Sequence, residues 1–248
     1  AAGGRRRGYR GGGGPGLGRG GEVGRAVAAL RRVVLLAWKD LVVEARSKEL
    51  LGAMFVFALL VVVIFSFGLD PARSEVRPLF PVILWVAVFF AWLNRSFSKE
   101  LEDQALWGMM LVPMDRSTVF YAKALSNLLL LLFTEAIVLP LFFVLLGQTL
   151  PGGLHLFLAA ILLGSVGFTL AGTLLGALAA GTRSGEMLLP VLLFPILVPV
   201  VLGVVQITQG LLLNLDPTGW RHWFQLLAAY DLIFLVLPLL LFEQVIEL

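Results

Sequence analysis

The sequence contains no cysteine, only two histidines and few charged residues. Asp, Glu, Lys and Arg make up 14% of the 248 residues, compared with roughly 25% in soluble domains. Without cysteine there is no disulfide framework, thiolate nucleophile or cysteine metal site, and no residue pattern indicates a catalytic pair or another metal site. The glycine-rich segment GRGGEVGR at 18–25 lacks the Lys and Ser/Thr of a phosphate-binding loop. The chain is therefore not expected to hydrolyse ATP.

Apolar residues are abundant and account for 59% of the chain. They are gathered into long runs, and a helix needs about 20 residues to cross a bilayer. A buried core helix can mimic one such run, but the few polar residues left over could not cover six of them. We predict an all-α integral membrane protein with six transmembrane helices, at about 50–67, 79–97, 124–146, 154–180, 188–207 and 226–242.

The first 24 residues differ in composition, being rich in glycine and arginine and without apolar periodicity. Segments of this kind are typically disordered. They can bind RNA, and arginine-rich leaders can be targeting peptides. However, the chain's net charge of +3 is too small to argue for nucleic acid, and no amphipathic pattern is present. We expect a disordered extension at 1–24, followed by one six-span domain at 25–248.

Residues 25–48 are predicted to form an amphipathic helix that lies flat in the membrane interface. Apolar residues recur at helical spacing from Val27 to Leu41, and the charged side chains lie away from this stripe. An interfacial helix places lysine and arginine at the level of the head groups. Its characteristic residues here are Trp38, Lys39, Asp40 and Arg46. The alternative is a cytoplasmic extension of the first crossing helix.

Lysine and arginine near the ends of the spans indicate the orientation. One side of the membrane has three of them, Arg73, Arg77 and Arg221. The other side has ten, which are Arg31, Arg32, Lys39, Arg46, Lys48, Arg95, Lys99, Arg116, Lys123 and Arg183. Because the cytoplasmic side carries the excess, both termini and residues 94–123 are predicted to face the cytoplasm.

Between the second and third spans lies the charged segment ELEDQALWGMMLVPMDR, at 100–116. Its apolar residues share one helical face, and Pro113 ends the helix because the residue before proline resists helical geometry. Periodicity alone would allow this cytoplasmic helix to rest on the membrane. Its acidic residues would be repelled by an anionic leaflet, and Trp and Met favour contact surfaces, so we expect a protein partner. The contact residues are predicted to be Leu101, Glu102, Asp103, Leu106, Trp107, Met109, Met110, Pro113, Asp115 and Arg116.

Two carboxylates lie within the predicted spans, Glu135 in the third and Asp231 in the sixth. A charge at a helix centre costs about 2.5 to 3.5 kcal/mol on insertion scales, so a reason for burial is expected. Glu135, near Asn127, is expected to face a helix interface or a cavity, with either a structural hydrogen bond or a substrate role. Asp231 lies five residues into its span and is expected near the outer interface. His155 and His222 fall at the outer face and are expected to be interfacial residues rather than ligands.

Small residues and prolines mark the fourth and fifth spans. Gly172 and Gly176 form a small-xxx-small face that permits close approach of helices. Pro195 and Pro199 remove backbone donors and should kink the fifth helix. The kink would be either an irregularity of packing or part of a gated motion.

Taken in order along the chain, these parts resemble the membrane subunit of a type-2 ABC exporter. The resemblance is closer to the haem exporter protein B family, the permease of the cytochrome c maturation system, and covers residues 30–248. It is carried first by Trp85, Glu102, Asp103, Leu106, Leu111, Pro113, Ala122 and Lys123. It continues in LLGSVGFTLAGTLLGALAAGTRSGEMLLPVLLFPILVP, with Gly164, Gly176, Arg183, Pro195 and Pro199 at matching places. Gln104 and Trp107 depart from the family pattern, in which glycine and an acid are common there.

The resemblance implies a permease subunit whose ATP is hydrolysed by a separate ABC ATPase subunit in contact with residues 97–113. It also implies a second permease copy, haem-handling membrane proteins of the cytochrome c maturation pathway as partners, and a bacterial inner membrane. Haem would be the substrate and not a bound cofactor. Two routes stay open, passage of haem through this subunit or ATP-driven release of a haem chaperone. The alternatives are an exporter of a polysaccharide, lipid-linked compound or drug, or a membrane scaffold without a transport cycle.

Overall fold

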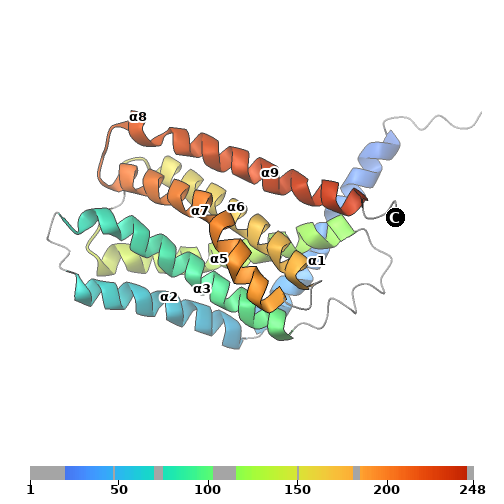
Figure 1. Cartoon of the computed structure of the whole chain (residues 1–248), viewed down its shortest axis with the longest axis horizontal. Coiled ribbons are helices and arrows are strands. Elements are labelled where there is room, and N and C mark those ends of the chain that lie inside the picture. Colours follow the sequence, from blue (N-terminus) through green and yellow to red (C-terminus); the bar gives the residue numbers. More distant parts are fainter. Residues whose placement is uncertain are drawn as a thin grey trace, which may run out of the picture.

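The described part of the chain is built from helices (Figure 1). The structure is a computed structural model that describes residues 20–46, 48–69, 75–102, 116–149, 151–180 and 185–244. Its long helices are α1 (Gly20–Arg46), α2 (Lys48–Gly68), α3 (Phe80–Glu102), α5 (Arg116–Leu145), α6 (Leu154–Ala180), α7 (Gly185–Leu212) and α9 (His222–Gln244). Two short elements complete them, the 3-10 helix η1 (Arg77–Leu79) before α3 and the single turn α8 (Pro217–Trp220) before α9.

Helices α2, α3, α5, α6, α7 and α9 lie side by side and alternate in direction (Figure 1). The connections α2–α3, α5–α6 and α7–α9 are at one end of the bundle, which we call the α8 end. Helix α1 lies at the opposite end, called the α1 end, where it packs mainly against α5. Helix α6 is central, because it contacts α3, α5, α7 and α9. Ser165, Thr169 and Thr173 of α6 are therefore placed in the interior.

The helices have the length and composition of membrane spans. Four apolar stretches are long enough to cross a bilayer: Ser117–Leu145, Leu154–Leu178, Leu192–Leu212 and Pro217–Leu241. Shorter apolar stretches lie in the described parts of the first two bundle helices, at Met54–Gly68 and Arg77–Leu93. Large apolar side chains cover the outside of the bundle, for example Phe133, Val144 and Leu232, each more than half exposed. This surface is typical of a protein surrounded by lipid, and the prediction of an all-α membrane protein is confirmed.

The observed helix bounds agree best with the predicted ones where an apolar run fills the whole helix. Helix α6 covers 154–180, as predicted. Helix α5 begins at Arg116, eight residues before the predicted span, and α9 begins at His222, four residues before it. The first turns of both helices contain polar residues, so hydropathy alone did not reveal them. Helix α3 continues through 97–102 to Glu102, so the start of the predicted cytoplasmic helix extends the second bundle helix. Residues 103–115 lie outside the described residues.

Helix α1 is inclined to α2 (Figure 1), and residues of its apolar stripe are exposed. Val27, Val34 and Trp38 are at least half exposed, whereas Ala37 is buried. The side chains of Lys39 and Asp40 form an ion pair with 3.8 Å between Nζ and Oδ1. An exposed apolar stripe beside charged residues suits a helix that lies in the membrane interface, and this placement stays a prediction. Arg46 ends α1.

A stack of aromatic side chains forms the centre of the core. Trp85, Phe89 and Trp92 lie on one face of α3, and their spacing of four and three residues matches the helical period. Phe89 stacks on Phe168 of α6 with 4.1 Å between ring centroids, and Trp92 meets the edge of the same ring at 5.1 Å. Gly172 gives Trp92 its space, because a Cβ there would lie 2.7 Å from the indole ring. The predicted small-residue face of α6 thus receives a tryptophan at Gly172.

Gly172→Ala should destabilise the protein. The added methyl group would overlap the Trp92 ring, which is held by Phe168, and overpacking of this kind costs typically about 1–3 kcal/mol. The matched control is Gly52→Ala in α2, where a Cβ would meet nothing within 4 Å. That change should be neutral or stabilise by up to about 1 kcal/mol, because alanine favours a helix over glycine. Thermal unfolding of the purified protein in detergent measures both, and equal midpoints for the two variants would contradict the packing at Gly172.

Candidate functional site

The interior of the bundle contains two carboxylates on opposite sides of α6. Glu135 of α5 is 1% exposed and Asp231 of α9 is 9% exposed. Glu135 contacts Ser165, and Asp231 lies beside Gly167, two positions further along α6. Because successive helix positions are about 100° apart, two positions place the carboxylates on nearly opposite faces. Such residues within membrane helices mark candidate functional sites.

Glu135 is held by one hydroxyl group. The Oγ atom of Ser165 lies 2.8 Å from Oε1 and 2.9 Å from Oε2 of Glu135, close enough to donate to either oxygen. A charge at a helix centre costs about 2.5–3.5 kcal/mol on insertion scales, and a hydrogen bond offsets part of this cost. The contact joins α5 to α6 inside the bundle.

A line of hydroxyl groups on α6 extends this contact. Ser165, Thr169 and Thr173 follow one another at four-residue spacing and so share one face of the helix. The Nδ2 atom of Asn127 donates to Oγ1 of Thr173 at 3.0 Å, and Thr169 donates to the carbonyl oxygen of Ser165 at 2.7 Å. Glu135 and Asn127 are eight residues apart on α5, as are their partners on α6. We call this line of contacts the α5–α6 seam. The α6 side of this seam was not predicted, although the four-residue spacing of its hydroxyl residues is visible in the sequence.

Asp231 differs from Glu135 because neither of its oxygens has a hydrogen-bond partner. It lies nine residues into α9, deeper than the five residues counted from the predicted span, because α9 begins at His222. Nine residues of helix rise about 14 Å. A Cβ at Gly167 would lie 2.4 Å from Oδ1 of Asp231 and 3.3 Å from Val200 of α7. The carboxylate is therefore enclosed between α6, α7 and α9.

Tyrosine hydroxyls donate to backbone carbonyls beside the helix prolines. Helix α7 runs without interruption through Pro195 and Pro199, and each proline leaves a carbonyl without its helical donor. The hydroxyl of Tyr230 donates to the carbonyl oxygen of Ile196, three residues before Pro199, at 3.0 Å. Tyr121 likewise donates to Leu235, three residues before Pro238 of α9. These bonds tie α7 to α9 and α5 to α9 where proline interrupts the helical pattern.

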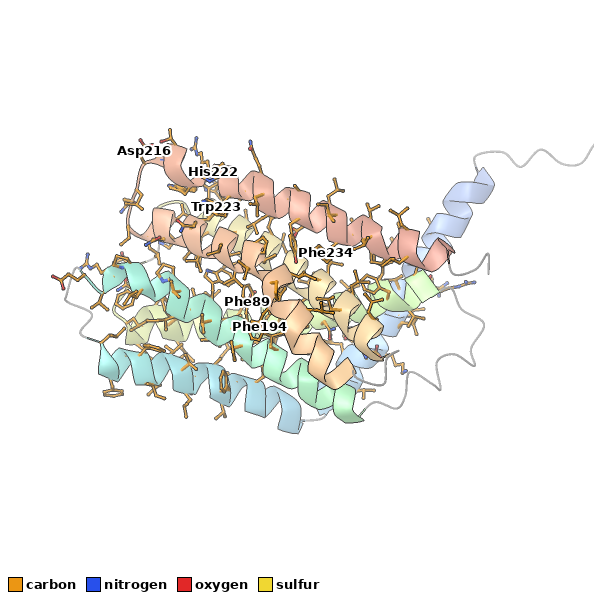
Figure 2. All side chains as sticks on the ribbon, in the orientation of Figure 1. Phe89, Phe194, Asp216, His222, Trp223 and Phe234 are labelled. Carbon is orange, nitrogen blue, oxygen red and sulfur yellow. The ribbon has the colours of Figure 1, made fainter. Side chains whose placement is uncertain are left out.

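The α8 end carries the polar and aromatic residues that were assigned to the outer face. Figure 2 shows Asp216, His222 and Trp223 at this end of the bundle. The Asp216 carboxylate accepts from the backbone amide of Thr218 and caps α8, and this backbone bond holds the pKa of Asp216 below its usual value. The His222 ring lies 5.2 Å from that of Trp223. Among the described residues no group of three His, Cys, Asp or Glu side chains could hold a metal ion.

A groove of about 710 Å³ opens between α5 and α6 near the α8 end. Its walls include Leu139, Phe143, Phe157 and Ile161, and Gln148 supplies the one polar side chain of the lining. An apolar lining of this kind suits acyl chains or another apolar surface. The groove adds no charged group to the carboxylates.

The site residues predicted for the cytoplasmic segment are placed only in part. The backbone of Leu101 and Glu102 ends α3, and that of Arg116 begins α5. The other predicted contact residues, Asp103, Leu106, Trp107, Met109, Met110, Pro113 and Asp115, lie outside the described residues. The intramembrane candidates Asn127 and Glu135 are brought to one helix interface, and Asp231 to another.

Comparison with known proteins assigns most of the chain to one group. The profile of the family described as CcmB protein matches residues 31–246. A protein named "Heme exporter protein B" from Pseudomonas aeruginosa is 29% identical over 80% of this chain and 90% of its own length. Proteins of the same name from Rhodobacter capsulatus and Bradyrhizobium diazoefficiens are 31% and 30% identical. They match 69% and 85% of this chain, and 80% and 91% of their own length.

Ser165→Ala should lower the free energy of unfolding by about 1–3 kcal/mol, because the buried Glu135 carboxyl loses its donor. In a Glu135→Leu background the same change should cost clearly less, since no carboxyl is left unsatisfied. Denaturant unfolding of the four proteins in detergent gives this double-mutant cycle. Ser66→Ala, at an exposed hydroxyl that donates to the carbonyl of Leu145, is the matched control and should have a small effect. An equal cost of Ser165→Ala in both backgrounds would mean that the two side chains are not coupled.

Proposed function

The chain belongs to the CcmB protein family, and from this premise we propose that it is the membrane permease subunit of an ATP-driven transporter for cytochrome c maturation. The observation that carries this proposal is the family match over residues 31–246, nearly the whole helical part of the chain. Support comes from relatives that are named for haem export and match along 80–91% of their own length. The chain is thus a membrane component of haem export. It acts mechanically and is not itself an enzyme.

We further propose six membrane crossings with both termini in the cytoplasm of the inner membrane. Helices α2 and α3 have 21 and 23 residues, enough to cross beside the four longer apolar stretches. The alternating direction of the six bundle helices agrees with this number (Figure 1). Of the lysine and arginine residues counted above, nine lie in described helices at the α1 end, and Arg77 and Arg221 lie at the α8 end. By the positive-inside rule the α1 end is cytoplasmic.

ATP hydrolysis would act on the segment between α3 and α5. Helix α3 ends at Glu102 and α5 begins at Arg116, both at the α1 end, so residues 103–115 connect them there. A separate ABC ATPase subunit would contact residues 101–116 on the cytoplasmic side. The acidic side chains in this segment disfavour an anionic leaflet as its partner, and Trp107 and the two methionines favour a protein surface.

Closure of the ATPase would move α3 and α5, because these helices are continuous with the contact segment. Both pack against α6, so their displacement would shift the population between two arrangements of the bundle. That shift would drive haem export or the release of a haem chaperone on the outer side. A second copy of the permease and haem-handling membrane proteins of the pathway would complete the complex.

Asp103→Ala together with Trp107→Ala should weaken the association with the ATPase subunit by about tenfold or more, equal to about 1.4 kcal/mol of binding free energy. The change removes a carboxylate and the largest side chain of the contact segment. The measurement is the amount of ATPase subunit that co-purifies with the tagged permease, together with its ATPase rate.

The control for this double substitution is Glu75→Gln, an exposed acid at the α8 end. It changes one charge on the opposite side of the proposed membrane and should leave the ATPase bound. Since the chain has no cysteine, single cysteines at 103 and 75 also report the orientation by labelling in intact cells. Full binding and activity of the Asp103/Trp107 variant, or labelling of position 103 only from outside, would overturn the coupling proposal.

Deletion of the gene should abolish covalent attachment of haem to c-type cytochromes, because the maturation pathway would lack its permease. Haem-dependent peroxidase staining of membrane and periplasmic proteins measures this loss, and the intact gene supplied on a plasmid should restore the stain. Normal c-type cytochromes in the deletion strain would exclude the role in cytochrome maturation. The alternative would then be an exporter of another substrate. Its coupling to an ATPase is tested separately by the Asp103/Trp107 variant.

A further inference from the structure

Asp231 has the surroundings of a proton-binding site. Its side chain is more than nine-tenths buried, and neither carboxylate oxygen has a hydrogen-bond partner. A carboxylate enclosed in apolar surroundings without a donor is unfavourable in its charged form. We propose that Asp231 binds a proton while α6, α7 and α9 are packed together, and that it releases this proton when α9 separates from α6.

No described side chain places a positive charge against Asp231. Helix α6 faces it with Gly167, Val200 of α7 lies next to Gly167, and Tyr230 is its neighbour on α9. Helix α5 touches α9 through Tyr121, so Lys123, two positions further on, points to another side of α5. Glu135 lies across α6. The remaining described titratable groups on α6 and around α8 are in the first turn of α6 or next to α8, at the α8 end: His155, Asp216, Arg221 and His222.

The packing around Asp231 is close on the side of Gly167. Gly167 approaches so closely that a single added methyl group would overlap the carboxylate oxygen. A metal cation needs several oxygen ligands, and the neighbouring groups are a glycine and a valine. The Tyr230 hydroxyl is already directed to the carbonyl of Ile196. The neutral acid is therefore the form that fits.

Helix α9 lies in the least buried of the four long apolar stretches, which suits it to separate. Among the four apolar stretches, 22% of the one that contains α9 is buried, compared with 56% of the one in α6. Its contacts with α6 and α7 include the glycine surfaces at Gly167 and Gly203. Glu135, in contrast, is fastened to Ser165 in the α5–α6 seam. Water reaching a separated α9 would hydrate Asp231 first and stabilise its charged form.

The consequence is a contact whose stability depends on pH. A proton that is bound only in the packed arrangement stabilises that arrangement at low pH, and raising the pH shifts the population toward separation. The proton site rests on the packing alone. Only the assignment of the separation to a transport cycle rests on the proposed function.

Infrared spectroscopy of the purified full-length protein tests the proton directly. A C=O stretching band of a protonated carboxylic acid should persist at neutral pH and shift when aspartate is labelled with ¹³C at its carboxyl group. The band should disappear in Asp231→Asn and remain in the matched variant Glu135→Gln. Absence of an aspartate-dependent band in the wild-type protein would overturn the proposal. The isotope shift needs no variant, so it decides the question even where Asp231→Asn does not fold.

Distance measurements between spin labels test the link to separation. Leu162 of α6 and Leu232 of α9 are exposed, and cysteines placed there can be labelled without background because the chain has none. The population with the longer distance should grow with pH in the wild-type background and in Glu135→Gln. In Asp231→Asn, whose side chain stays neutral, this growth should be lost. An equal increase of the long-distance population with pH in Asp231→Asn would overturn the proposal. The measurement needs neither ATPase nor haem, so it does not depend on the proposed function.

Discussion

Hydrocarbon offers no hydrogen bonds, so a polar group inside a membrane protein must find its partner in the protein itself or stay uncharged. This constraint explains the arrangement around α6. Its Ser165 and Thr173 are paired with polar side chains of α5, and Trp85 of α3 donates to Thr208 of α7 at 2.9 Å. Asp231 meets the same constraint in the other way, by lying where only its neutral form is stable.

Apolar side chains do not hold membrane helices together as they do in water, because lipid is equally apolar. Close fit takes over that role here. Glycines on α6 and α7 receive a tryptophan, a valine or a leucine from a neighbouring helix, as Gly172 receives Trp92 and Gly203 receives Leu227. The prolines of α7 and α9 each remove a backbone hydrogen bond from the helix. Tyrosines of the neighbouring helix donate to carbonyl oxygens near these prolines. In both helices the interhelical hydrogen bond therefore lies within one turn of a proline.

Several features of the fold could be predicted from the residues because they depend on local composition. Helix α6 has its predicted bounds since its apolar run fills the helix, and the apolar stripe of α1 is visible in its periodicity. The first turns of α5 and α9 were not predicted as helix because they contain polar residues. Pairing between distant helices could not be read from spacing, so the partner of Glu135 and the burial of Asp231 were not foreseen. The depth of Asp231 was underestimated because the start of α9 was placed too late.

The two contacts of the α5–α6 seam have a geometric consequence. Asn127 with Thr173 and Glu135 with Ser165 lie eight residues apart on each helix, a distance of about 12 Å. A single contact would act as a pivot, but two contacts at this separation prevent both swivelling and sliding of one helix on the other. The hairpin of α5 and α6 would therefore move as one rigid body. A displacement of α5 at Arg116 would tilt the whole hairpin and move the loop after Leu145 at the opposite surface of the bilayer.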